Sequence, residues 1–375
     1  MTLSLRGITK SYGSLLANDG VDLDVAAGEL HGLLGENGAG KSTLMKVLSG
    51  FVRADAGEVA IDGRVLSMAS PRDAIGAGIG MLHQDPLVFG PFTVLDNFLL
   101  ASPGGARLDR ARGREQLEDA AQRYGFTFDP DAVARTLTVG ERQQLEIARL
   151  LWLGARLLIF DEPTTGISAD QRDKLFDILR RLAADGLMVI FVSHKLEEIE
   201  QLCERVTIMR GGRVVGREDM PVPPERLVEL MFGEILVIPD RPPATLGPTV
   251  LNVRDAGFSD RVEVTDVSID VAEAEVLGLA GLEGSGQRTF LRGCAGLIAA
   301  DRGSILVDGT DVSKRSYRAF RDAGVHLLPA GRLEEGLVPG LTIAEHFELV
   351  SANRSFFVDW GAADSTARER IASDS

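Results

Sequence analysis

The sequence predicts an α/β protein that contains two tandem copies of one domain, the second of them incomplete. Short apolar runs at Leu30–Leu34, Leu157–Phe160 and Met188–Val192 are bounded by turn or polar residues, which is typical of buried parallel strands. Residues 170–184 carry apolar side chains at helical spacing, and Gly186 follows as a stop signal. Strands that alternate with helices in this way indicate an α/β fold.

An internal repeat divides the chain. Val21–Gly63 aligns with Val267–Gly309 without a gap, and GELHGLLGENGAGKST in the first copy corresponds to AEVLGLAGLEGSGQRT in the second. Prolines cluster between the copies, from residue 221 to residue 248, and proline is better suited to a linker than to the interior of a helix or sheet. We therefore expect a first domain over 1–233, a linker over 234–248 and a partial second domain over 249–375.

The composition excludes several classes of protein. Hydrophobic residues make up 45% of the 375 residues and charged residues 25%, as in a globular protein, and the net charge of -15 argues against a nucleic-acid partner. Cys203 and Cys294 lie too far apart to form a zinc pair or a disulfide framework, so we expect both to be buried in a protein of the reducing cytosol. No signal peptide is evident, and no apolar run reaches the ~20 residues that cross a bilayer.

A glycine-rich loop follows the first apolar run. Gly35–Ser42 fits the pattern G-x-x-x-x-G-K-[ST] between a predicted strand and a predicted helix, a context that disfavours the alternative of a chance glycine-rich turn. Lys41 is expected to reach the β- and γ-phosphates of ATP, and the Ser42 hydroxyl to ligate Mg²⁺. The residues expected to bind ATP here are Gly35, Glu36, Asn37, Gly38, Ala39, Gly40, Lys41, Ser42 and Thr43.

Two carboxylates follow the apolar run Leu157–Phe160. A buried strand would deliver Asp161 to its tip, where the side chain can hold Mg²⁺ through water, and Glu162 can then accept a proton from an attacking water. Many strands end in an acidic residue, so this pattern indicates a catalytic site only in combination with the phosphate loop. Together the two motifs predict a site for hydrolysis of ATP.

Leu137-Thr138-Val139-Gly140-Glu141 lies upstream of the carboxylates and resembles the signature sequence of ABC ATPases, whose usual form is LSGGQ. The resemblance covers essentially the whole chain. It implies the P-loop NTPase fold of the ABC ATPase type, and a head-to-tail dimer in which each ATP lies between one domain's phosphate loop and the other's signature. Thr138 keeps the hydroxyl of the usual serine, whereas Val139 and Glu141 are variations familiar from importers of sugars and nucleosides.

The resemblance assigns three more residues of the first domain. Tyr12 resembles the aromatic residue that stacks on adenine, although a surface tyrosine is the alternative. Gln84 resembles the glutamine that contacts Mg²⁺ or the attacking water and senses the transmembrane partner. His194 resembles the switch histidine that contacts the γ-phosphate, whereas a lone histidine is more often structural. After the carboxylates, Thr165–Ser168 stands where the family commonly has SALD, so the usual aspartate is missing.

The second copy departs further from the family pattern. Gln287 and Arg288 replace the lysine and the serine of the phosphate loop, and Ala330 takes the place of the sensor glutamine. The chain ends before a second signature, so we expect a truncated or split gene product whose second domain has an incomplete core and exposed apolar edges. A complete composite site would then need another copy of the first domain, a longer homologue or a separately encoded remainder.

Three functions fit these motifs. The fused domains and the runs SHKLEEI from Ser193, LCERVTIMRGGRVVG from Leu202 and EGLVPGLTIAEHF from Glu335 resemble the ATPases of sugar and nucleoside importers. This resemblance implies an ATPase at the cytoplasmic face of the membrane that contacts transmembrane permease subunits through residues near Pro86–Arg135 and works with a solute-binding protein. The alternatives are a soluble ABC ATPase that acts on ribosomes or DNA, and a non-hydrolytic ATP-binding regulator or truncated remnant.

Overall fold

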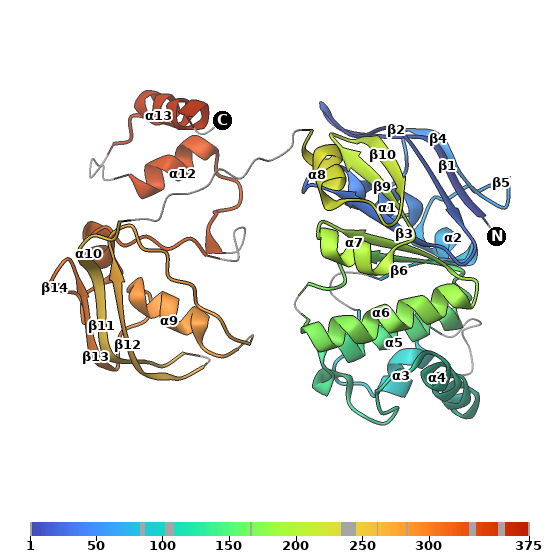
Figure 1. The fold of residues 1–375 in the computed structure, drawn as a ribbon, viewed down its shortest axis with the longest axis horizontal. Helices are drawn as coiled ribbons and strands as arrows, with labels where there is room; N and C mark the ends of the chain where they lie inside the picture. The colour runs from blue at the N-terminus through green and yellow to red at the C-terminus, as the bar shows by residue number, and fades with distance from the viewer. Residues whose placement is uncertain are drawn as a thin grey trace. The chain divides into compact units, whose positions relative to one another are not determined.

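Two units of the chain, Met1–Pro239 and Asp240–Ser375, fold around separate cores in the computed structural model (Figure 1). The structure describes residues 2–82, 87–101, 109–165, 167–233, 245–260, 262–282, 284–329, 335–351 and 357–373. Most of the predicted linker, residues 234–244, lies outside these ranges.

A six-stranded sheet in the order β10-β9-β3-β8-β7-β6 forms the centre of the first unit. Its neighbouring strands are parallel except for β9 and β10, which are antiparallel. The three predicted buried strands are confirmed, and they occupy the interior of this sheet. The strands are β3 (Leu30–Gly35), β6 (Ile79–Leu82), β7 (Leu157–Asp161), β8 (Met188–Ser193), β9 (Arg205–Arg210) and β10 (Arg213–Asp219).

Both faces of this sheet are covered, which explains why its strands are apolar without alternation. Along β8, Met188, Ile190 and Val192 join one core cluster, whereas Val189 and Phe191 join the other. The cluster that contains Met188 also contains buried residues of an antiparallel sheet in the order β2-β1-β4-β5. The cluster that contains Val189 includes buried residues of the helices on the opposite side (Figure 1). The antiparallel strands are β1 (Thr2–Tyr12), β2 (Leu15–Ala26), β4 (Ala56–Ile61) and β5 (Arg64–Val65).

The predicted helix over 170–184 is confirmed as α6 (Ala169–Ala184). Ser168 caps its N-terminus, because the hydroxyl accepts a hydrogen bond from the Gln171 N–H while the Gln171 side chain accepts one from the Ser168 N–H. The other helices of this unit are α1 (Lys41–Leu48), α2 (Pro71–Gly76), α3 (Val94–Leu99), α4 (Arg110–Tyr124), the 3₁₀ turn η1 (Ala134–Thr136), α5 (Val139–Trp152), α7 (Leu196–Leu202) and α8 (Pro224–Phe232).

The second unit contains a four-stranded antiparallel sheet in the order β12-β11-β13-β14. Phe258, Phe290 and Phe320 lie in its small core, together with Cys294. Cys203 is buried in the first unit, so both cysteines are free and buried as predicted. The elements are β11 (Thr249–Phe258), β12 (Val264–Ala272), β13 (Arg302–Val307), β14 (Thr310–Asp311), α9 (Gln287–Cys294), α10 (Tyr317–Asp322), α12 (Ile343–Val350) and α13 (Trp360–Ser373).

The segment of the second copy that corresponds to β3 forms no strand. In the first unit β3 is fully buried between β8 and β9, whereas residues 276–281 are irregular and exposed. Val276 is 95% exposed and Leu279 is 41% exposed. No strand pairs with these residues in the part of the second unit that the structure describes. The expected exposure of apolar residues in the second unit is therefore confirmed at this segment.

None of the helices that the structure describes is long and apolar enough to cross a membrane.

Candidate nucleotide-binding and hydrolysis site

The phosphate loop joins the carboxyl end of β3 to the first residue of α1. Gly40 precedes α1 with φ of 98°, a left-handed conformation that glycine adopts without strain. A Cβ atom added at Gly40 would lie 2.3 Å from the carbonyl oxygen of Ala17 and 2.8 Å from Nδ2 of Asn18. The Asn18 amide donates to the Gly40 carbonyl at 3.1 Å. The loop therefore requires glycine because β2 packs against it.

Lys41 is the buried cation of the loop. Its Nζ donates to the carbonyl oxygens of Gly35 at 2.7 Å and Glu36 at 3.0 Å, and the residue is only 5% exposed. Burial lowers the pKa of Lys41, and the nearby carboxylates of Glu162 and Asp161 partly oppose this. A polyphosphate at the loop would stabilise the charged ammonium, because opposite charge raises the pKa of an amine.

Asp161 ends β7, and its carboxylate lies close enough to the Ser42 hydroxyl for the hydroxyl to affect its pKa. Burial is the largest cause that raises the pKa of Asp161, and the Ser42 hydrogen bond acts in the opposite direction. No group of three or more His, Cys, Asp and Glu side chains with the geometry of a metal site occurs in the described parts of the chain. A hydroxyl beside one carboxylate still fits Mg²⁺, which commonly takes one or two protein ligands and fills its remaining positions with phosphate and water.

Glu162 and His194 meet at the ends of two adjacent strands. Glu162 follows β7 and His194 follows β8, and Nδ1 of His194 lies 2.9 Å from Oε1 of Glu162. The side chain of Glu162 is 28% exposed and that of His194 is 43% exposed, so both can reach a ligand. Glu162 has φ of 49°, a conformation that is rare for a residue other than glycine and is often found at functional sites.

The predicted signature lies at the start of α5. Thr138 caps this helix: its hydroxyl accepts from the Glu141 N–H at 3.3 Å, and the Glu141 carboxylate accepts from the Thr138 N–H at 2.8 Å. This reciprocal pair is a capping box, which the usual serine and glutamine can also form, so both substitutions preserve the cap of α5. Leu137 is buried, whereas Val139 is 39% exposed.

Tyr12 ends β1 and is 47% exposed. It pairs with Leu15 across the β1–β2 hairpin, and the hairpin also supplies Asn18 to the phosphate loop. The Lys10 ammonium lies 5.7 Å from the centre of the tyrosine ring. The ring is therefore accessible on the hairpin that contacts the phosphate loop, a place suited to stacking on a base.

Two predicted residues, Gln84 of the first copy and Ala330 of the second, lie outside the described residues. Sequence reasoning missed the contact between Asn18 and Gly40, because no local pattern predicts a contact between a strand and a distant loop. It also missed Gln143, whose amide donates to the Pro163 carbonyl at 2.7 Å beside Glu162.

The sequence matches the ABC transporter family over residues 18–165 and 264–373. The chain belongs to this family. It is 34% identical to a nucleoside import ATP-binding protein of Lactococcus lactis, over 96% of this chain and 74% of the relative. A ribose import ATP-binding protein of Rubrobacter xylanophilus is 39% identical, over 99% of this chain and 75% of the relative. A glucose import ATP-binding protein of Haloferax volcanii is 38% identical, over 91% of this chain and 68% of the relative.

Solved ATP-binding cassettes of ABC transporters share the fold. The ADP conformation of one cassette gives a TM-score of 0.54 at 25% identity, covering 62% of this chain and all of that chain. A dimeric cassette in a post-hydrolysis state, bound to ADP and Pi, gives a TM-score of 0.51 at 23% identity. The match covers 59% of this chain and all of that chain, and it supports the fold alone. The predicted ABC ATPase fold is confirmed, and the chain is an ABC-type ATPase.

The second copy of the ABC phosphate loop keeps the backbone conformation of its glycines. Gly284 and Gly286 have φ of 83° and 99°, against 85° and 98° for Gly38 and Gly40. Helix α9 begins directly after Gly286, as α1 begins after Gly40. The described glycines of the loop therefore keep their conformation although residues 276–281 form no strand.

The side chains of this second loop have changed. Nε2 of Gln287 donates to the Leu282 carbonyl at 3.3 Å, and Arg288 forms an ion pair with Glu335. These residues border a cavity of about 790 Å³. The cavity lacks an equivalent of Lys41 and of the Ser42 hydroxyl, which are the groups that act on the phosphates and the metal in P-loop ATPases.

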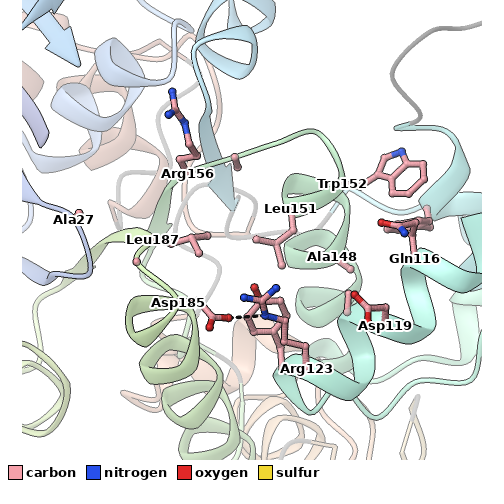
Figure 2. A pocket seen from close by; sticks show the side chains of 15 residues that line it. Ala27, Gln116, Asp119, Arg123, Ala148, Leu151, Trp152, Arg156, Asp185 and Leu187 are labelled. Atoms are coloured by element: carbon pink, nitrogen blue, oxygen red, sulfur yellow. Dashed lines mark hydrogen bonds and ion pairs between the residues drawn. The ribbon is translucent and has the colours of Figure 1, made fainter. Parts of the chain in front are cut away.

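A separate hollow of about 460 Å³ lies in the first unit between α4, the end of α5 and the turn before β8 (Figure 2). Figure 2 shows Leu151 and Leu187 near its centre, with the ion pair between Arg123 and Asp185 at one side, where Nε lies 2.8 Å from Oδ2. None of the predicted nucleotide-site residues that the structure describes lines this hollow. The hollow is thus distinct from the described part of the ATPase site.

Proposed function

We propose that the chain is the ATP-hydrolysing subunit of an importer for a sugar or a nucleoside, and that it works through separate permease subunits. The named functions of the relatives support this class of cargo. The observation that carries the proposal is the arrangement of Lys41, Glu162 and His194 at the carboxyl ends of β3, β7 and β8, which are neighbours in one sheet. Ligands of open α/β sheets bind at this edge.

Each part of the site has a chemical task. The backbone N–H groups of residues 35–40 and the positive end of α1 bind phosphate oxygens, and Lys41 binds the β- and γ-phosphates. Ser42 and Asp161, the latter through water, would hold Mg²⁺, which neutralises charge on the phosphates when it is bound. Gln84 is the proposed additional contact to the metal or water.

Hydrolysis requires a water that loses a proton as it attacks the γ-phosphorus. Glu162 is placed to accept this proton, and His194 holds the Glu162 carboxylate and contacts the γ-phosphate. Tyr12 stacks on the adenine. Since the signature Leu137–Glu141 serves the partner's ATP in this arrangement, a second nucleotide-binding domain is required in trans, from another copy or a homologue.

The domain boundaries follow the same division. We propose a catalytically equipped first domain over 1–233, a linker over 234–248 and a degenerate second domain over 249–375. The second domain then has a structural or regulatory task, because its loop lacks the lysine and the hydroxyl that hydrolysis needs.

We propose that an apolar surface of the first unit contacts the permease at the cytoplasmic face of the membrane. Phe51, Leu87 and Phe89 are 51%, 62% and 58% exposed, and a hollow of about 180 Å³ lined mainly by apolar side chains adjoins Phe51 and Leu87. Exposed apolar patches of this kind mark sites of protein contact. A solute-binding protein would deliver the cargo to the permease.

The ATPase assay of the full chain tests the hydrolytic assignment. We expect Glu162→Gln to lower kcat by at least ~100-fold while Mg·ATP still binds, because general-base catalysis contributes about 10²–10⁴-fold. Lys41→Met should weaken Mg·ATP binding itself. Glu200→Gln, which changes an exposed carboxylate on α7, is the matched control. Equal turnover of the Glu162→Gln variant and the wild-type protein, both near zero, would instead favour the non-hydrolytic regulator.

A further inference from the structure

The segment that carries Glu162 is anchored from one helix and one loop. From α5, Nε2 of Gln143 donates to the Pro163 carbonyl at 2.7 Å, and Gln143 is only 2% exposed. From the loop that carries His194, Nζ of Lys195 donates to the Thr164 hydroxyl at 3.2 Å. The two residues that follow Glu162 are thus held by contacts from elements on either side.

Lys195 is also bound to a buried carboxylate. Its Nζ lies 2.9 Å from Oε1 of Glu198, which is 3% exposed. The other carboxylate oxygen of Glu198 accepts from the Ser193 hydroxyl at 2.8 Å, and the Ser193 hydroxyl accepts from the Lys195 N–H at 3.0 Å. A buried carboxylate requires such partners, so this network fixes the Lys195 ammonium in place.

We propose that Lys195 is a positioning residue for hydrolysis, which joins the loop of His194 to the loop of Glu162 through Thr164. The proposal rests on the proposed ATPase roles of Glu162 and His194. It concerns the geometry of the pair rather than nucleotide binding, because Lys195 and Thr164 belong to the loops after β8 and β7 and not to the phosphate loop.

The conformation of Glu162 explains why such an anchor is needed. A residue other than glycine with φ of 49° is strained and persists only where its surroundings hold it. Rotation of the segment 162–164 would separate the Glu162 carboxylate from His194. The contacts to Pro163 and Thr164 prevent this rotation at the two positions next to the strained residue.

Capping of α7 alone would favour a different residue at this position. Lys195 occupies the N-cap of α7 and its side chain makes no capping hydrogen bond. Ser, Thr, Asp and Asn are the preferred N-caps, and a cation near the N-terminus of a helix is disfavoured by the helix dipole. The lysine therefore serves α7 through its ion pair with Glu198 rather than as a cap, and the same ammonium reaches across to Thr164.

The experiment compares Lys195→Met, Lys195→Arg and Thr164→Val in the full chain, with Lys314→Met on the exposed surface of the second unit as the matched control. ATPase kcat and KM, equilibrium binding of a non-hydrolysable ATP analogue and the melting temperature are measured. We expect Lys195→Met to lower kcat by about 10- to 100-fold, since small misplacements of reacting groups cost rates of this order, while KM and analogue binding change by less than about twofold.

The other variants separate the possible explanations. Lys195→Arg should restore most of kcat, and Thr164→Val, which leaves the pair between Lys195 and Glu198 in place, should lower kcat alone. Unchanged kcat in both Lys195→Met and Thr164→Val overturns the proposal, as does an equal loss of kcat and analogue binding. If Lys195→Met fails to fold, Thr164→Val decides. A Glu162→Gln variant with full activity would refute the proposed ATPase mechanism itself, which is a different outcome.

Discussion

A buried carboxylate on α5 gives the first unit a pH-dependent stability. Glu146 is 5% exposed, and its carboxylate accepts a hydrogen bond from the Leu87 N–H at 3.3 Å. Burial raises the pKa of Glu146 from 4.5 to about 7, although the Arg149 guanidinium and the Leu87 hydrogen bond act in the opposite direction. The folded protein thus binds a proton at pH values where the unfolded chain has lost it.

The sign and size of the effect follow from this pKa. Below about pH 4.5 Glu146 is protonated in both states and contributes nothing. Between about pH 4.5 and 7 only the folded state keeps the proton, so the free energy of unfolding falls as pH rises. Above pH 7 the carboxylate is ionised in both states, and burial of its charge costs about 3 kcal/mol, since one pKa unit corresponds to about 1.4 kcal/mol.

Glu146→Gln removes the charge and keeps an acceptor for the Leu87 N–H. Denaturant unfolding is followed by the fluorescence of Trp152 in a Trp360→Phe background, because these are the two tryptophans of the chain and Trp152 lies on α5. The variant should be more stable than its parent by as much as about 3 kcal/mol at pH 8.5, with most of this gain lost at pH 5.

Glu146→Gln also buries an amide donor, and the free-energy cost of this burial does not depend on pH. This cost therefore cancels when the stability differences at the two pH values are compared. Glu200→Gln, at an exposed position of α7, should show no comparable difference. The reasoning is refuted if the stability difference between Glu146→Gln and its parent is the same at both pH values, or if the variant is less stable only at high pH.

Two further predictions concern the ligand and the partner. Tyr12→Ala should weaken equilibrium binding of ATP by about 1–3 kcal/mol, the typical value of stacking between a base and an aromatic ring, and an unchanged affinity would assign the ring to the surface. Phe89→Glu should abolish co-purification with the permease while the ATPase activity of the isolated chain is retained, and undiminished co-purification would exclude this apolar surface as the docking site.

The parts of the fold that were predictable depend on local pattern. The strands β3, β7 and β8 were evident because each is a short apolar run, and the phosphate loop because its glycines and lysine are consecutive. The sheet order and the anchors at Gln143 and Lys195 were not evident, since they join residues that are far apart in sequence. The distance between Glu162 and His194 likewise required the structure.

The two copies of one sequence pattern show what local signals cannot decide. LHGLLG at Leu30–Gly35 forms a buried strand, whereas VLGLAG at residues 276–281 is equally apolar and forms none. Both segments lead into glycines of the same conformation and then into a helix. The glycines keep their conformation in both copies, whereas β3 pairs with β8 and β9 and residues 276–281 form no strand.

This difference separates nucleotide binding from hydrolysis in physical terms. A glycine loop and a helix N-terminus are local structures that can hold phosphate without the rest of the sheet. The carboxylates and the histidine lie on strands that must pair side by side before Glu162 and His194 can meet. The proposed role of Lys195 and the hydrogen bond from Gln143 extend this dependence, because both residues contact the segment after β7 from positions far away in the sequence. Hydrolysis is therefore the property that should be lost first when the sheet or its anchors are disturbed, while binding of the phosphates persists.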